Sequence, residues 1–184
     1  MRIALAVTEN QEMKKSSPQI KVKKSTHHST ITGDFAERLV LYWLSKSGYE
    51  CGRFDYTGID ILAAAQDGRL MGISVQCRSR YLGTERESVS LHKFEKARVA
   101  CTTFGCDPYA AIVADRDGVI SCYFMSLDQL EKHARGKSRQ WLMSNRALER
   151  YRDDPKIVQF QLDGCSNWCD GSEAFKALAA APAR

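Results

Sequence analysis

The segments Gly58-Ile59-Asp60-Ile61-Leu62 and Ile73-Ser74-Val75-Gln76-Cys77-Arg78 decide how this chain folds. Each contains an apolar run typical of a β-strand, and the turn signal Asp67-Gly68 lies between them, so together they predict a β-hairpin. Because side chains alternate between the two faces of a strand, Gln76 and Arg78 are expected on one face. Together with the carboxylate of the first segment they would bring an acid, an amide and a fixed cation to one place, which suits a metal ion and a phosphate.

Length and composition predict one globular domain with tails. The chain has 184 residues, of which 43% are hydrophobic, enough to bury a single core. No uninterrupted apolar run reaches about 18 residues, so no membrane span is expected. The seven cysteines are scattered and odd in number. They favour a cytoplasmic, intracellular protein with reduced thiols over a disulfide scaffold.

The positive charge is concentrated near the N-terminus. The whole chain carries +5, and residues 1–32 hold six basic residues against two acidic ones, which leaves +1 for the remainder. We therefore expect a flexible basic tail over residues 1–31 and one α/β domain over residues 32–184. Lys21, Lys23 and Lys24 of the tail are predicted to contact nucleic-acid phosphates. A solvated leader without a ligand is the alternative.

Hydrophobic periodicity predicts the order of helices and strands. Helices are expected at about 32–48, 91–104, 126–133, 138–151 and 173–180, and strands at about 49–54, 56–65, 70–77, 109–114, 119–125 and 157–162. Thr32 or Asp34 is a candidate cap of the first helix, and Ser126 with Gln129 forms a capping box for the third.

This order of elements predicts an α/β fold with a central mixed β-sheet flanked by helices. The core is expected over residues 32–125. Residues 126–184 are expected to form a C-terminal addition of helices and one strand.

Three short motifs resemble the PD-(D/E)xK nuclease superfamily. They are Gly33-Asp34-Phe35-Ala36-Glu37, Gly58-Ile59-Asp60 and Val75-Gln76-Cys77-Arg78. The resemblance is to the variant with Gln in place of the second acid, as in Mrr-type restriction enzymes and some intron-encoded homing endonucleases. It covers roughly residues 32–113 and implies a restriction-endonuclease-like core.

The resemblance implies a hydrolase that cuts DNA phosphodiester bonds with Mg²⁺, or with Mn²⁺ in its place. Asp60 would bind the metal directly, since a hard cation prefers carboxylate oxygen. Gln76 would offer its amide oxygen or act through its neighbour's carbonyl. Glu37, from the first helix, would bind the metal through water or position that water. The metal would activate the attacking water.

Arg78 departs from the family pattern, which has Lys at this position. A guanidinium stays protonated to a pH of about 12, so it cannot act as a general base. Arg78 can still contact the scissile phosphate and stabilise developing charge. This departure supports an alternative function, in which the fold is kept as a catalytically degenerate module that binds nucleic acid or a protein partner.

Structural explanations of the same residues also stand. Glu37 would favour a helix N-terminus through the helix dipole. Asp60 would be satisfied by an ion pair with Arg78, without any catalysis. Asp55 is the reserve acid if the strand register differs from the predicted one.

Residues that follow the motif are candidate DNA contacts. Arg80, Tyr81 and Arg86 would meet a nucleic-acid backbone or stack on a base. The predicted partner is DNA, with single-stranded, duplex and branched forms all open, and no membrane. A homodimer is an arrangement that the resemblance allows.

Overall fold

The structure is a computed structural model that describes residues 25–79, 88–116, 119–137 and 139–163. Its centre is a six-stranded sheet in the order β1-β2-β3-β5-β6-β8. Only β3 and β5 run parallel among the strand pairs of this described part, and all other neighbours are antiparallel, so the sheet is mixed. The strands span β1 Glu50–Tyr56, β2 Ile59–Ala64, β3 Leu70–Ser79, β5 Asp107–Arg116, β6 Val119–Ser126 and β8 Val158–Asp163.

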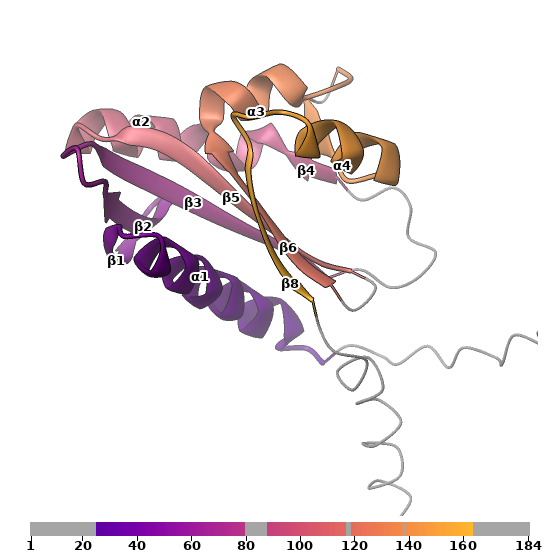
Figure 1. Cartoon of the computed structure of the whole chain (residues 1–184), viewed down its shortest axis with the longest axis horizontal. Helices are drawn as coiled ribbons and strands as arrows, with labels where there is room; N and C mark the ends of the chain where they lie inside the picture. Colours follow the sequence, from indigo (N-terminus) through magenta and orange to yellow (C-terminus); the bar gives the residue numbers. More distant parts are fainter. Residues whose placement is uncertain (1–24, 80–87, 117–118, 138, 164–184) are drawn as a thin grey trace, which may run out of the picture.

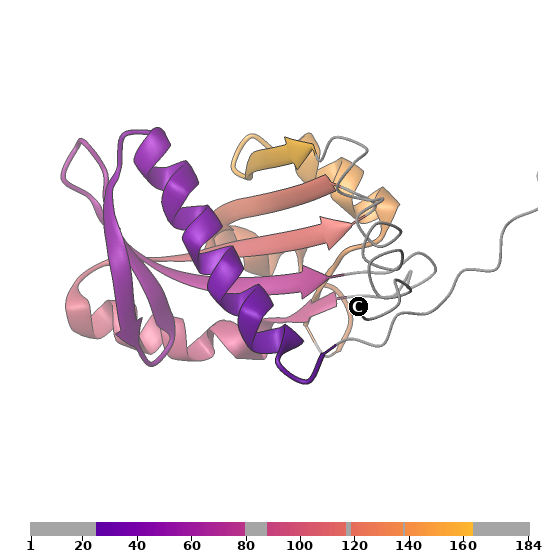
Figure 2. The ribbon, with the colours of Figure 1, turned by 90° about the horizontal axis from the view of Figure 1, so that it is seen from below.

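Helices cover both faces of this sheet (Figures 1 and 2). One face carries α1 (His28–Lys46), which packs on β1, β2 and β3. The other face carries the remaining helices, which are the 3₁₀ helix η1 (Leu91–Phe94), α2 (Glu95–Phe104), α3 (Leu127–His133) and α4 (Asn145–Arg152). The predicted fold class, a central mixed sheet flanked by helices, is confirmed.

The middle strands are buried on both faces, which explains their continuous apolar sequences. In β5, Ala110 and Ile112 belong to the core under η1, α3 and α4, whereas Ala111 and Val113 belong to the core under α1. Alternation along a strand therefore supplies two hydrophobic cores from one segment.

The first helix begins earlier than predicted. Its N-cap is His27, so residues 28–31 of the predicted tail are helical. Neither Thr32 nor Asp34 caps it, since both lie inside the helix, and the Thr32 hydroxyl donates to the His28 carbonyl at 2.9 Å. Residues 1–24 lie outside the described part of the chain.

The predicted helix over residues 138–151 is wrong. Its first half is strand β7 (Gln140–Leu142), which pairs with β4 (Ser88–Ser90), and its second half is α4. The reason is a tertiary contact, because the strand pairing buries Trp141 completely in the core under η1, α3 and α4. Local periodicity does not reveal such a partner, because it lies about fifty residues away in sequence.

The described residues after 126, which are 127–137 and 139–163, are part of the main fold. Ser126 caps α3 as predicted, since its hydroxyl accepts from the Gln129 amide at 3.3 Å. The predicted edge strand is present as β8, which pairs with β6. The predicted helix at 173–180 lies outside the described residues. In the part that the structure does describe, no helix is long and apolar enough to cross a membrane.

Candidate active site

The carboxylate of Asp60 lies where the pairing of β2 with β3 ends. The last paired residues of this ladder are Ile61 and Ile73. Just beyond this pair, the Val75 backbone N–H donates to Asp60 Oδ2 at 2.6 Å, and the Ser74 hydroxyl donates to the same oxygen at 3.4 Å. The Asp60 carboxylate thus accepts a backbone N–H that a neighbouring strand would otherwise bind, and two hydrogen bonds hold it in place.

Burial dominates the electrostatics of Asp60. Desolvation raises the pKa of this carboxyl group, and the nearby Asp55 raises it further. The hydrogen bonds from Val75 and Ser74 and the charge of Arg53 lower it, but the net pKa is above the usual value. A positive ligand at this carboxylate would remove that penalty.

Glu37 approaches Asp60 from α1, on one face of the sheet. Burial raises the pKa of Glu37, and the next cause is the charge of Asp60, so the two carboxylates lie close enough to interact. The helix has no acidic residue in its first turn, and Glu37 lies well inside it. The explanation of Glu37 through the helix dipole is therefore wrong.

Arg53 was not identified from the sequence. Its Nη2 atom lies 2.9 Å from Glu37 Oε2, with the two side chains 47% and 20% exposed. Its charge lowers the pKa of both Glu37 and Asp60. The sequence alone gives no signal for it, because its position depends on the register of the first hairpin, in which Arg53 pairs with Ile61, the residue next to Asp60.

Gln76 and Arg78 lie on β3, both half-buried. The Gln76 amide donates through Nε2 to the Val75 carbonyl at 2.9 Å. The Arg78 guanidinium donates to the Cys77 carbonyl at 2.8 Å, and it lies near Lys93 of η1, whose pKa is lowered by burial and then by Arg78.

The alternative ion pair between Asp60 and Arg78 is not formed. The hydrogen bonds of Asp60 come from Val75 and Ser74, and among the residues described, no ion pair joins it to Arg78. The structure therefore brings Asp60, Glu37 and Arg53 together, with Gln76 and Arg78 on the adjoining strand. The other predicted contacts, Lys21, Lys23, Lys24, Arg80, Tyr81 and Arg86, lie outside the described residues.

The donors at this junction fit a hard cation by their chemistry. They are two carboxylates whose pKa values are both raised by burial, that of Glu37 also by the charge of Asp60, with an amide side chain on the next strand. Within the described residues, no group of three or more His, Cys, Asp or Glu side chains could hold a metal ion. A cation here would depend on Asp60, Glu37 and the Gln76 amide oxygen, with water completing its shell.

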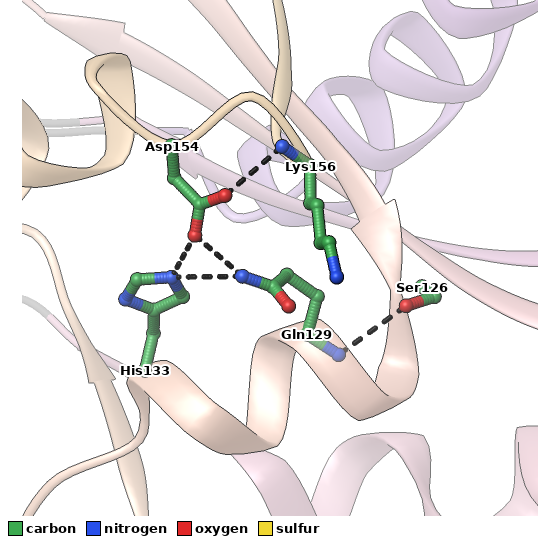
Figure 3. A network of polar contacts seen from close by, with 5 residues as sticks. All are labelled: Ser126, Gln129, His133, Asp154 and Lys156. Atoms are coloured by element: carbon green, nitrogen blue, oxygen red, sulfur yellow. Dashed lines mark hydrogen bonds and ion pairs between the residues drawn. The ribbon is translucent and has the colours of Figure 1, made fainter.

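A second polar cluster lies on the face of the sheet that α3 and α4 cover, and the sequence did not reveal it (Figure 3). Asp154 accepts from the Lys156 backbone N–H at 2.9 Å, lies 2.6 Å from His133 Nε2, and also accepts from the Gln129 side chain. These bonds lower the pKa of Asp154. The cluster joins α3 to the loop before β8, and its members satisfy one another.

No family model matches the chain, and no curated protein matches it. The solved structures that are similar to it include three nucleases. The Holliday junction resolvase of Archaeoglobus fulgidus, an archaeal hyperthermophile, matches at a TM-score of 0.47 and 19% identity, over 64% of this chain and 88% of that chain. A bacterial homing endonuclease matches at a TM-score of 0.36 and 13% identity, over 55% of this chain and 70% of that chain. A restriction endonuclease in complex with substrate DNA matches at a TM-score of 0.38 and 12% identity, over 84% of this chain and 83% of that chain. With TM-scores below 0.5, function has to be argued from the residues of this chain.

Proposed function

We propose that this protein is a metal-dependent endodeoxyribonuclease of the PD-(D/E)xK type, in the variant with Gln76 and Arg78 at the motif positions. The observation that carries the proposal is the junction of Asp60 with Glu37. Two partly buried carboxylates from different layers interact electrostatically near the end of a strand ladder, and Asp60 is anchored there by a backbone N–H. Like charges held together in a partly buried place favour a cation.

In this proposal, Asp60, Glu37 and Gln76 hold Mg²⁺, with Mn²⁺ as an alternative. When bound, the metal would polarise the scissile phosphate and lower the pKa of the attacking water. Asp60 brings its charge to a fixed position, because Val75 and Ser74 hold its Oδ2 atom. Gln76 uses its Nε2 donor on the Val75 carbonyl, which leaves its oxygen for the cation.

The cations nearby have a charge-balancing role. Arg53 pairs with Glu37 and offsets its charge in the metal-free protein. Arg78 and Lys93, from separate elements, lie close enough to repel each other, so an anionic DNA phosphate would relieve them both. Neither arginine loses its proton, so they stabilise charge and do not remove a proton from water.

DNA is the proposed partner, and the remaining predicted contacts belong to this proposal. Arg80, Tyr81 and Arg86 directly follow β3, and Lys21, Lys23 and Lys24 precede α1. A homodimer, which would place two sites on one duplex, is also proposed.

A catalytically degenerate module that binds nucleic acid is the second candidate. The ion pair of Arg53 with Glu37 favours it, because that pair already neutralises one of the two carboxylates. In that case the protein would bind DNA through its cations without cutting it.

The test is cleavage of supercoiled plasmid and of a labelled single strand, with Mg²⁺ or Mn²⁺, beside Asp60→Ala and Asp55→Ala. The nuclease predicts metal-dependent cleavage that Asp60→Ala abolishes. Loss of cleavage in Asp55→Ala alone would move the metal to the reserve acid. Folded wild-type protein that binds both substrates but cuts neither would favour the degenerate module.

A further inference from the structure

Cys101 and Cys106 lie at the C-terminal end of α2, where the helix ends in a Schellman motif. Gly105 adopts the left-handed conformation (φ 64°), and the Cys106 N–H donates to the Cys101 carbonyl at 3.0 Å. In this motif the two residues joined by that bond bring their side chains into contact. The backbone therefore holds two thiols next to each other.

Both thiols are buried against Gly72 of β3. Cys101 is 1% exposed and Cys106 is 9% exposed. A Cβ atom at Gly72 would lie 2.5 Å from the Cys101 sulfur and 2.9 Å from the Cys106 sulfur, so the sulfurs cannot be farther apart than these two distances together. The Cys101 thiol also donates to the Gly72 carbonyl, at 3.6 Å. The missing side chain at Gly72 leaves the space in which the sulfurs meet.

The same surroundings make the pair slow to react in the folded protein. Burial, and then the adjacent Cys106 thiol, raise the pKa of Cys101 to about 12. The thiolate is the attacking species in thiol–disulfide exchange, so it is scarce here. Reaction therefore requires the end of α2 to open, after which the helix cap brings the sulfurs together again.

We propose that Cys101 and Cys106 form a site of reversible oxidation, at which a small-molecule disulfide converts the two thiols into one intramolecular disulfide. One protein thiolate attacks the oxidant and releases one of its two thiols. The second protein thiolate then attacks the mixed disulfide, forms the bond between Cys101 and Cys106 and releases the other thiol. The protein loses two protons and two electrons, and the oxidant gains them. In a reducing environment the pair stays as thiols.

The test treats the folded full-length chain with oxidised glutathione and then alkylates it with iodoacetamide in denaturant. Residues 99–116 form one tryptic peptide that contains these two cysteines and no other. We expect this peptide to become lighter by two hydrogen atoms, to carry no alkyl group, and to revert when thiol is added. A peptide alkylated at both cysteines, a lasting glutathione adduct, or a bond to another cysteine would overturn the proposal.

A matched variant separates this pair from the other buried thiols. Cys122 is also buried, but it belongs to the core under α1, on the other face of the sheet. Cys122→Ala is expected to form the same disulfide at the same rate, and loss of the disulfide in this variant would contradict the assignment. Neither measurement uses DNA cleavage, so its result is independent of the proposed nuclease activity.

Discussion

Two half-buried aspartates show how different surroundings direct the same side chain to different roles. Asp60 and Asp154 each accept a backbone N–H, from Val75 and Lys156, and each also accepts a side-chain donor. Yet burial raises the pKa of Asp60, whereas the Lys156 amide and then His133 lower the pKa of Asp154. The hydrogen bonds are of one kind, so the stronger desolvation of Asp60 makes the main difference, and the charges around each carboxylate add to it.

Among the charges around Asp60, Asp55 raises its pKa and Arg53 lowers it, and Asp60 in turn raises the pKa of Glu37. Asp154 instead has His133 and Gln129 turned toward it (Figure 3). A carboxylate held among other carboxylates is poised for an outside cation. One surrounded by donors is already satisfied and serves to join parts of the fold.

The largest expected difference between the two aspartates is in activity. Asp60→Asn should reduce metal-dependent DNA cleavage at least about 100-fold, because a metal ligand supplies several kcal/mol of transition-state stabilisation. Asp154→Asn, made as the matched variant, should cleave at the wild-type rate. Plasmid nicking under single-turnover conditions measures both. Equal losses in the two variants would mean that the comparison reflects folding and not a site.

The second largest expected difference between the two aspartates is in metal binding. Mg²⁺ or Mn²⁺ at 100 times its dissociation constant should stabilise the wild-type protein by about 2.7 kcal/mol. The same addition should stabilise Asp154→Asn equally and leave Asp60→Asn unchanged. Urea unfolding with and without metal, in the absence of DNA, gives the answer. A metal effect that survives in Asp60→Asn would place the ion elsewhere.

In the metal-free protein, Asp154→Asn rather than Asp60→Asn should be the more damaging change, and the quantity affected is the free energy of unfolding. Asp154→Asn should lower the free energy of unfolding by about 1–2 kcal/mol, because His133, Gln129 and the Lys156 amide lose a charged acceptor. Asp60→Asn should leave stability unchanged or increase it, as expected where a charge is buried for function. Urea midpoints compare the two directly, and a large loss in Asp60→Asn would assign that residue a structural role.

The stability difference between wild type and each variant should also depend on pH, which is a smaller effect. As the pH rises, wild type should lose stability relative to Asp60→Asn and gain stability relative to Asp154→Asn. The raised pKa of Asp60 means that ionisation costs the folded state, so wild type loses stability relative to Asp60→Asn as the pH rises above about 4. The lowered pKa of Asp154 means that its contribution is present above about pH 4 and is lost as the pH falls. Unfolding measured from pH 3 to pH 7 should therefore show both differences shrinking toward acid. A gap for either variant that stayed constant over this range would contradict the corresponding pKa shift.

Much of the fold could be predicted because its signals are local. Asp67-Gly68 ends one strand and starts the next, and Gly68 has the positive φ of 82° that such a turn requires. The apolar run at 109–114 is a strand because both faces are buried, and Ser126 caps α3. Each of these signals depends on a few neighbouring residues.

What was missed depends on contacts between distant residues. The strand at Gln140–Leu142 exists because it pairs with Ser88–Ser90, and no periodicity predicts such a partner. At the candidate site, the motif identifies Asp60 and Glu37 but not Arg53, which reaches Glu37 only after the first hairpin has set its register. The Asp154 cluster was missed for the same reason.

The parallel pairing of β3 with β5 divides the chain in a way that bears on the order of folding. Every side chain of the Asp60 junction comes from the elements before this crossover, between Glu37 and Arg78, and its strands are joined by short turns. Contacts between residues near in sequence close small loops and form early, whereas β8 must wait for the far edge of the sheet.

In pulse-labelling hydrogen exchange during refolding, we therefore expect the Val75 amide, which Asp60 holds, to gain protection before the amides shared by β6 and β8. Simultaneous protection of both sets would contradict this order. If it holds, the carboxylate junction is assembled before the sheet that surrounds it is complete, and the later half of the chain adds stability to a site whose geometry is already set.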